Sequence, residues 1–140
     1  MKRKKNLTMK GFTLIELLVV ISIILILMGF VVPKFSGYQD KAKTTKAINA
    51  GKQIETAAMA SYGENEGQFL EDNVEECIEE LTTAENPEVT AIGSDGKSVN
   101  ITYTSDDKNY QIKIDADNDN YLIREFDEDS SHKIIFSNTP

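Results

Sequence analysis

The sequence predicts an α+β fold in which one long N-terminal helix packs on a small antiparallel β-sheet. Two observations support this prediction. Apolar residues recur at helical spacings of three and four from Phe12 to about Tyr62. From Glu88 onward they alternate with polar residues, which is the period of a β-strand. A helix with one apolar face and a sheet with one apolar face each need a partner, so we expect them to cover each other.

Residues 12–33 form the predicted membrane-spanning part of the helix. Between Leu17 and Val32, every residue except one serine and one glycine is plainly apolar. At a rise of about 1.5 Å per residue, the first 21 residues of this segment span about 31 Å, enough for a hydrocarbon core of about 30 Å. A carboxylate inside such a segment is costly and indicates a functional site, so Glu16 is the first candidate.

A basic leader precedes the apolar segment. Residues 1–11 hold five lysines and arginines and no acidic residue. A positive N-terminal flank favours an N-terminus in the cytoplasm. A secretory signal peptide would place a small-residue cleavage site after its apolar run, and residues 31–36 lack that pattern. We therefore expect the apolar segment to remain in the mature protein.

The residues at the junction of the leader and the helix resemble a signature sequence of a known protein family. The run Gly11-Phe12-Thr13-Leu14-Ile15-Glu16-Leu17-Leu18-Val19-Val20 resembles the prepilin signature of type IV pilins and type II secretion pseudopilins. The resemblance implies that a membrane-bound prepilin peptidase removes residues 1–11 by cutting between Gly11 and Phe12, and methylates Phe12. It implies a pilin-like fold, with residues 34–140 as an extracytoplasmic headgroup. Pro33 stands where many members have a helix-kinking proline, and proline removes a backbone donor.

The signature also implies a role for Glu16 in assembly. Cleavage creates a positive amine at Phe12, and the Glu16 carboxylate of a neighbouring subunit would neutralise it. In a low-dielectric helix bundle this pairing is far stronger than in water, and an unpaired charge is strongly disfavoured. Two alternatives are that Glu16 only sits at the membrane interface, or that it pairs with its own amine one turn away.

The second half of the chain divides into one helix and several strands. Gly63 is the expected cap of the long helix. A second, acidic helix from Leu70 to Leu81 presents one apolar stripe. The stripe consists of Leu70, Val74, Cys77, Ile78 and Leu81. Strands are predicted at Val99–Tyr103, Tyr110–Ile114, Tyr121–Phe126 and Lys133–Phe136, separated by turns rich in Gly, Ser, Asp and Asn. The pattern predicts an antiparallel meander.

The charges are segregated along the chain. Without the leader, 10 basic residues face 23 acidic ones, a net charge of −13. Residues 34–54 carry a net +4 and residues 55–140 a net −16. The basic segment fits a membrane-interface flank. The acidic remainder fits a solvated surface and argues against direct binding of nucleic acid, which needs a basic surface.

The sequence contains no catalytic constellation. His132 is the only histidine, which excludes a His-centred triad or a multi-histidine metal site, and there is no glycine-rich phosphate loop. Cys77 is the only cysteine, so an intramolecular disulfide is impossible. We expect Cys77 to be a small buried apolar residue, with a bridge between subunits or a reactive thiol as the alternatives. We therefore predict that the protein is not an enzyme.

One acidic turn is a weak calcium candidate. Asp115, Asp117 and Asp119 alternate as oxygen donors, as in the first half of an EF-hand loop. Asn120 replaces the expected glycine, and Phe126 stands where the bidentate glutamate would be, so the loop is not an EF-hand. Some secretion pseudopilins use an acidic loop in this region for calcium, which is a loose resemblance. The alternative is a hairpin turn of residues that bond their own backbone.

The resemblance implies a structural subunit that polymerises through its N-terminal helix into a type IV pilus or pilin-like filament. Adhesion, surface motility or related roles would follow. The implied partners are further copies of the chain, other pilins, the prepilin peptidase, the inner-membrane assembly platform and, before assembly, the cytoplasmic membrane. After assembly the chain would lie in an extracellular filament. The alternatives are a pseudopilin of a type II secretion or competence machine, and a single-pass membrane-anchored binding module that never polymerises.

Overall fold

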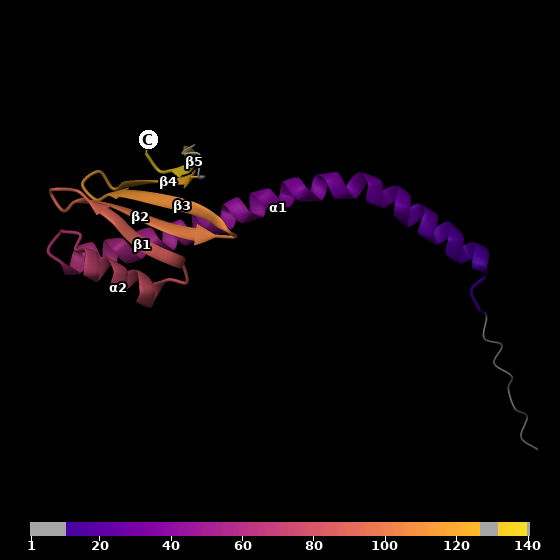
Figure 1. The fold of residues 1–140 in the computed structure, drawn as a ribbon, viewed down its shortest axis with the longest axis horizontal. Helices are drawn as coiled ribbons and strands as arrows, with labels where there is room; N and C mark the ends of the chain where they lie inside the picture. The colour runs from indigo at the N-terminus through magenta and orange to yellow at the C-terminus, as the bar shows by residue number, and fades with distance from the viewer. Residues whose placement is uncertain (1–10, 127–131, 140) are drawn as a thin grey trace, which may run out of the picture. The chain divides into compact units, whose positions relative to one another are not determined.

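The chain folds into two helices followed by a five-stranded sheet (Figure 1). The computed structural model describes residues 11–126 and 132–139, and at positions 33 and 34 it describes the backbone alone. The elements are α1 (Leu14–Glu64), α2 (Glu71–Leu81), β1 (Glu85–Ile92), β2 (Ser98–Ser105), β3 (Lys108–Asp115), β4 (Asn120–Phe126) and β5 (His132–Ser137). The predicted α+β class, with a long N-terminal helix and a small sheet, is confirmed.

The chain divides into two compact units, Met1–Gln39 and Asp40–Pro140. The boundary that the sequence predicts after Pro33 stays a prediction. In the first unit, Leu14–Val32 is long and apolar enough to cross a membrane, with a mean hydropathy of 3.0 and no buried residue. Phe35 and Tyr38, which follow, are also exposed. The apolar face of α1 is therefore buried by the chain's own sheet only further along.

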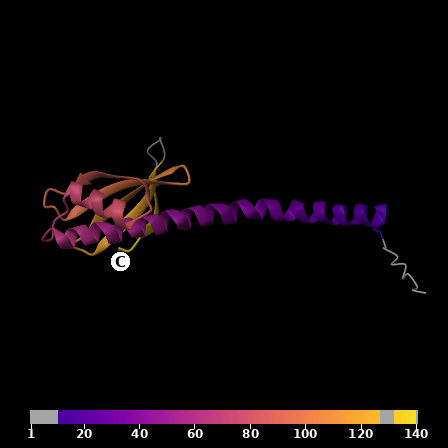
Figure 2. The ribbon, with the colours of Figure 1, turned by 90° about the horizontal axis from the view of Figure 1, so that it is seen from below.

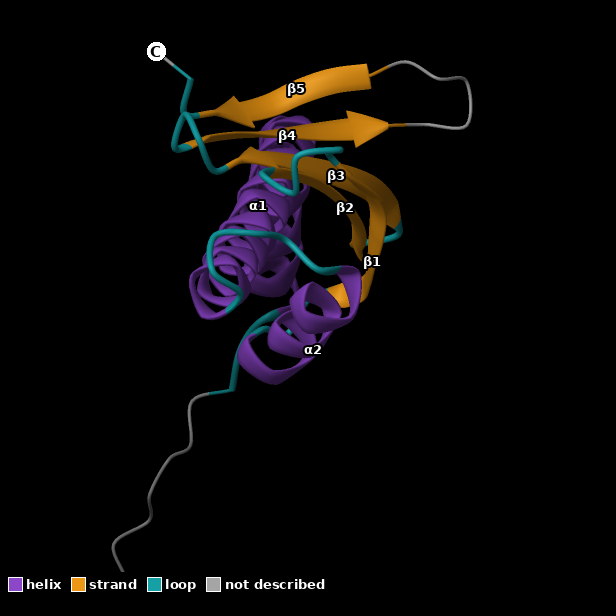
Figure 3. Cartoon of the chain, turned by 90° about the vertical axis from the view of Figure 1, so that its left-hand side faces the viewer, coloured by secondary structure: helices purple, strands orange, loops and turns teal. Residues whose placement is uncertain are grey.

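The five strands lie in sequence order in one antiparallel sheet. This order is the meander that the sequence predicts. In the Asp40–Pro140 unit, the C-terminal part of α1 and the whole of α2 lie on the same face of the sheet (Figure 3). Figure 2 shows α2 running beside that part of α1. The sheet thus has one covered face and one face open to solvent, as its alternating pattern requires.

The core is built from rows of side chains that cross the sheet. In one row, Ile101 pairs with Ile112, which pairs with Ile123, and all three are fully buried. In the next, Tyr103 pairs with Tyr110, and their rings stack with centroids 5.5 Å apart. Helix α1 covers these rows with Ala47, Ile54, Ala57 and Ala58. The predicted packing of the helix stripe on the sheet is therefore confirmed.

Helix α1 lies directly against the sheet at Gly51. A Cβ atom at this position would lie 2.5 Å from Ile123 Cδ1 and 2.8 Å from Tyr103 Oη. The Tyr103 hydroxyl donates a 2.8 Å hydrogen bond to the Ala47 carbonyl in the same turn of the helix. Burial raises the pKa of Tyr103 well above its usual range. Glycine is needed here because any side chain would push α1 away from the sheet.

The second helix is shorter and less buried than its apolar pattern predicts. It begins at Glu71, with Leu70 at the N-cap position in an extended conformation. Val74 and Ile78 are buried, whereas Leu70 and Leu81 are 47% and 62% exposed. These two leucines lie at the two ends of the helix, Leu70 at the N-cap and Leu81 as the last residue. Only the middle of the predicted stripe therefore packs on the core.

The first strand, β1, is not among the strands that the sequence pattern predicts. β1 starts at Glu85 and contains Asn86, whose φ is +49°, and Pro87. Its pairing with β2 slips twice, between Glu85 and Glu88 and between Val89 and Ala91. Bulges and proline are typical of edge strands, where they prevent pairing with another chain. These irregularities hide the strand period in the sequence.

We expect Gly51→Ala to destabilise the protein and Gly63→Ala to leave it unchanged or slightly more stable. At Gly51 the new methyl group collides with two buried side chains and displaces the Tyr103 hydroxyl, a loss of about 1–3 kcal/mol. At Gly63, also in α1, a Cβ meets no atom within 4 Å, and alanine is the better helix former. Thermal unfolding of the full-length protein in detergent micelles measures both. Equal stability of the two variants would contradict the close approach.

Candidate functional site

The start of helix α1 is organised around Thr13 and Glu16. The Thr13 hydroxyl accepts a 3.3 Å hydrogen bond from the Glu16 backbone N–H. In return, Glu16 Oε2 accepts hydrogen bonds from the Thr13 backbone N–H at 2.8 Å and from the Thr13 hydroxyl at 2.9 Å. This reciprocal arrangement is a capping box, which satisfies backbone donors at the first turn of a helix. The carboxylate is thereby held at the helix start.

Thr13 is a site residue that we did not single out from the sequence. The signal was present, because a threonine followed three residues later by glutamate, just before an apolar run, is the capping-box pattern. The negative charge of Glu16 also lies at the positive end of the helix dipole. Glu16 thus has a local role in the single chain, in addition to any role between subunits.

The residues around Glu16 have no protein cover within the described chain. Phe12 is 91% exposed and Leu14 is 82% exposed. Phe12, Ile15 and Glu16 line an open, mostly apolar depression of about 340 Å³. Around Gly11 the space is also open, since a Cβ there would meet no atom within 4 Å. An apolar surface of this extent indicates contact with lipid or with another protein. Leader residues 1–10 lie outside the described residues.

Helix α1 continues through Pro33. The predicted kink at this position stays a prediction, and so does the processing of the chain between Gly11 and Phe12.

The acidic turn between β3 and β4 is held by its own hydrogen bonds. Asp115 Oδ1 accepts bonds from the backbone N–H groups of Asp117 and Asn118, at 3.1 and 3.3 Å. Asp115 Oδ2 accepts a 2.8 Å bond from the Asn118 side-chain amide, which is the main cause of a lowered Asp115 pKa. Asp117 pairs with Lys97 at 2.9 Å, and Asp119 adopts a positive φ of +49°. These bonds are those of a hairpin turn closed by its own side chains, and calcium binding by Asp115, Asp117 and Asp119 stays a hypothesis.

Two further residues from the sequence analysis are in unremarkable surroundings. Cys77 is half-buried and forms no disulfide, and its pKa is raised by burial and by neighbouring carboxylates. A raised pKa keeps the thiol protonated and unreactive at neutral pH. His132 is exposed, and its ring stacks on Phe126 with centroids 6.3 Å apart. In residues 11–126 and 132–139, no group of three acidic, histidine or cysteine side chains is arranged to hold a metal ion.

We expect millimolar calcium to leave the melting temperature of the full-length protein unchanged, because Asp115 and Asp117 already have hydrogen-bond and ion-pair partners. Isothermal titration of the protein in detergent micelles, with magnesium as the control, measures binding directly. Saturable heat with calcium but not with magnesium, lost in Asp117→Asn, would show that the turn opens to take the ion.

Comparisons with known proteins agree with the N-terminal geometry. The family model for the prokaryotic N-terminal methylation motif matches residues 8–32. A fimbrial protein of Pseudomonas aeruginosa is 38% identical over 52 residues, which are 37% of this chain and 34% of that protein. The type IV major pilin protein PilE1 of Neisseria gonorrhoeae is 37% identical over 68 residues, 49% of this chain and 41% of the relative. A fimbrial protein of Dichelobacter nodosus is 31% identical over 106 residues, 67% of this chain and 66% of the relative.

The chain spans about a third of the length of the Pseudomonas protein that it matches. No solved structure matched. The methylation motif coincides with the capped start of α1 and with its exposed apolar segment, and the relatives that share it are fimbrial and pilin proteins. This chain belongs to the type IV pilin family.

Proposed function

We propose that this chain is the structural subunit of a type IV pilus or pilin-like filament and is not an enzyme. Cleavage by a prepilin peptidase after Gly11 frees Phe12, and copies of the chain polymerise through helix α1. The observation that carries the proposal is the segment Leu14–Val32, wholly exposed and apolar, with the Glu16 carboxylate in its first turn. Such a surface is stable in a membrane or in a bundle of identical helices, but not in water.

Apolar burial alone does not drive assembly from the membrane. When α1 leaves lipid for a helix bundle, its side chains exchange one apolar environment for another, so little hydrophobic free energy is gained. A charge in that environment changes the balance, because an unpaired carboxylate is strongly disfavoured there. The Glu16 carboxylate therefore gives the assembly both a driving force and a register.

The partner of Glu16 in the filament is the amine of Phe12 on a neighbouring subunit. Both cap bonds to Thr13 use Oε2 of the carboxylate. Oε1 remains to accept a hydrogen bond from the new amine, so capping and pairing are compatible. The depression lined by Phe12, Ile15, Glu16, Val19 and Val20 provides an apolar surround for this pair.

The remaining partners and the location follow from the same proposal. The subunit waits in the cytoplasmic membrane with its N-terminus inside, is extracted by the inner-membrane assembly platform together with other pilins, and ends in a surface filament. Relatives named fimbrial protein and major pilin favour a pilus, with adhesion or motility, over the pseudopilin of a secretion or competence machine. A membrane-anchored binding module would keep the anchor and never polymerise.

We expect the mature protein to begin at Phe12 and to carry one added methyl group. Intact-mass analysis of protein purified from cells would show the loss of residues 1–11 and the gain of one methyl. Gly11→Val serves as the control, because a branched side chain at the cleavage site should block the peptidase and leave the leader attached. A wild-type chain that keeps its leader, or is cut beyond Val32, would contradict the pilin proposal.

Three variants separate the two roles of Glu16. Glu16→Gln keeps an oxygen for the capping box but loses the charge, and we expect it to be processed normally and to fail to assemble. Thr13→Ala loses the cap and keeps the charge, and we expect it to assemble with at most a modest loss. Glu16→Val, which loses both, should behave like Glu16→Gln.

The measurement is the amount of subunit in sheared-filament fractions relative to the amount in the membrane. Filaments of Glu16→Gln at the wild-type level would show that charge pairing is not required. Failure of Thr13→Ala with success of Glu16→Gln would reverse the assignment and make capping the essential role.

A further inference from the structure

The open face of the sheet carries an exposed isoleucine beside an arginine. Arg124 follows the buried Ile123 in β4, so its side chain lies on the face of the sheet that the helices leave open. Ile134 of β5 pairs with Arg124 and lies on the same face. Phe136 of the same strand packs against the core, whereas Ile134 is 62% exposed. We call these two residues the Arg124–Ile134 patch.

Arg124 has no partner for its charge among the described residues. Its Nε atom is buried and forms no hydrogen bond. No carboxylate of residues 11–126 and 132–139 forms an ion pair with it, and its cross-strand neighbour on β3 is the neutral Gln111. A buried polar atom without a partner calls for an explanation. Arginine is weakly hydrated and suits ion pairs at interfaces, so the side chain is ready to pair with a carboxylate from outside the chain.

The last turn of α2 has the opposite charge and also lacks a partner. Glu79 and Glu80 are exposed, and the turn contains no basic residue. The C-terminus of a helix carries a partial negative charge, so two carboxylates there are unfavourable. Leu81, the last residue of the helix, is 62% exposed. These three residues, the α2 end, combine a need for a cation with an apolar side chain, and the Arg124–Ile134 patch has both counterparts.

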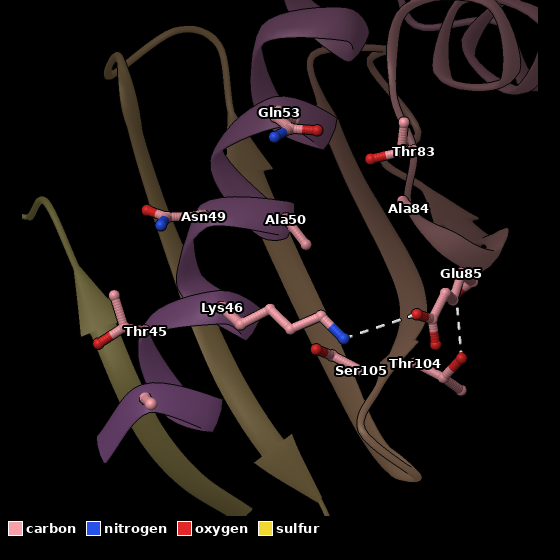
Figure 4. A pocket seen from close by; sticks show the side chains of 11 residues that line it. Thr45, Lys46, Asn49, Ala50, Gln53, Thr83, Ala84, Glu85, Thr104 and Ser105 are labelled. Carbon is pink, nitrogen blue, oxygen red and sulfur yellow. Dashed lines mark hydrogen bonds and ion pairs between the residues drawn. The ribbon is translucent and has the colours of Figure 1, made fainter. Parts of the chain in front are cut away.

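The two surfaces cannot meet within one chain. Helix α2 lies beside β1 on the covered face of the sheet, whereas the patch lies on the open face near the opposite edge (Figure 3). Two lysines of α1 near the covered face have other partners. Lys46 is paired with two carboxylates at 3.2 and 3.7 Å, and Figure 4 shows the contact with one of them, Glu85. The Lys52 ammonium lies 4.7 Å from the centre of the Phe136 ring.

The distribution of charge over the headgroup favours a second copy as the partner. Helix α2 holds six acidic residues and no basic one, whereas β3, β4 and β5 together hold four basic residues and two acidic ones. Two copies that bring α2 onto the strands therefore place opposite charges together, and two copies that bring α2 onto α2 place like charges together. A small anion would neutralise Arg124 but leave Ile134 exposed.

We propose that the α2 end of one copy docks on the Arg124–Ile134 patch of a second copy. Glu79 and Glu80 then pair with Arg124, and Leu81 packs on Ile134. Because the two surfaces differ, the contact is heterologous, and each copy can use both surfaces at once. The contact goes beyond assembly through α1 and does not depend on it. It is small and therefore weak by itself, and copies that are held close together by their helices would form it more readily.

Disulfide cross-linking of the full-length protein in detergent micelles tests this contact without requiring filaments. Cys77→Ser removes the native thiol, and Leu81→Cys together with Ile134→Cys places one thiol on each surface. After mild oxidation we expect dimers and larger oligomers on a non-reducing gel, because a heterologous contact continues from copy to copy. Leu81→Cys or Ile134→Cys alone has one thiol per chain and stops at the dimer.

The matched control is Leu81→Cys together with Thr102→Cys, also in the Cys77→Ser background. Thr102 lies in the same row of the open face as Ile134 but three strands away, about 14 Å, which is beyond the reach of a disulfide. We expect this pair to give far less oligomer than Leu81→Cys with Ile134→Cys. Equal yields from the two pairs would overturn the proposal.

Charge reversal tests the ion pair in the same assay. Arg124→Glu should lower the yield of oligomer about fivefold, and the further changes Glu79→Arg and Glu80→Arg should restore it. Lys41→Glu makes the same change of charge at an exposed residue of α1 outside the patch and should leave the yield unchanged. Arg124→Gln, which loses the charge but stays neutral, is the second variant, and thermal melting shows that each variant is folded. A swap that fails to restore the yield, or an equal loss in Lys41→Glu, would overturn the proposal.

Sheared filaments separate this proposal from the proposed function. Filaments from cells, together with no specific cross-link in micelles, would overturn the docking of headgroups and leave assembly through α1 unaffected. A specific cross-link in micelles, together with no filaments from cells, would support the docking and contradict the proposed filament.

Discussion

The contact between α1 and the sheet at Gly51 is the constraint on which the headgroup depends. The chain has one cysteine and therefore no internal disulfide, so non-covalent contacts hold the helix to the strands. Because Gly51 has no side chain, Ile123 and Tyr103 can reach the helix backbone. The Tyr103 hydroxyl donates to the carbonyl of Ala47, four residues before Gly51, so this buried polar group is satisfied where the helix lies against the sheet.

One helix serves two environments because its burial changes along its length. No residue of Leu14–Val32 is buried, whereas Ala47, Ile54 and Ala58 are wholly enclosed by the sheet. A continuous helix extends one hydrogen-bond ladder from the apolar segment into the folded unit. In the proposed function, membrane insertion and filament assembly would therefore use residues of α1 other than those that pack on the sheet. A substitution in one region can leave the other function intact, and the two Glu16 roles can be tested without disturbing the core.

Regular patterns of apolar residues in the sequence predicted most of the helices and strands. The features that were not predicted lie where the local structure departs from a regular helix or strand. The alternation at Val99, Ile101 and Tyr103 predicted β2 and the face of it that is buried. Each of these residues pairs with a buried residue of β3. β1 was harder to recognise, since Asn86 and Pro87 interrupt its period. Periodicity also reports only which face of a helix is apolar. It does not report where the neighbouring sheet ends, so it could not predict that Leu70 and Leu81 are exposed.

At the candidate site, the sequence predicted which residue matters but not where its side chain lies. Glu16 could be identified because a charge in an apolar helix is costly. The position of its carboxylate could not be predicted, because it depends on the hydrogen bonds to Thr13. A glutamate held in a capping box has already lost much of its rotamer freedom within the single chain. In the proposed filament, pairing with a neighbouring amine would then need little further ordering, and more of the electrostatic gain would remain for assembly. On this argument Thr13 preorganises the charge that Glu16 supplies, which explains why a cap and a charge occupy the same turn.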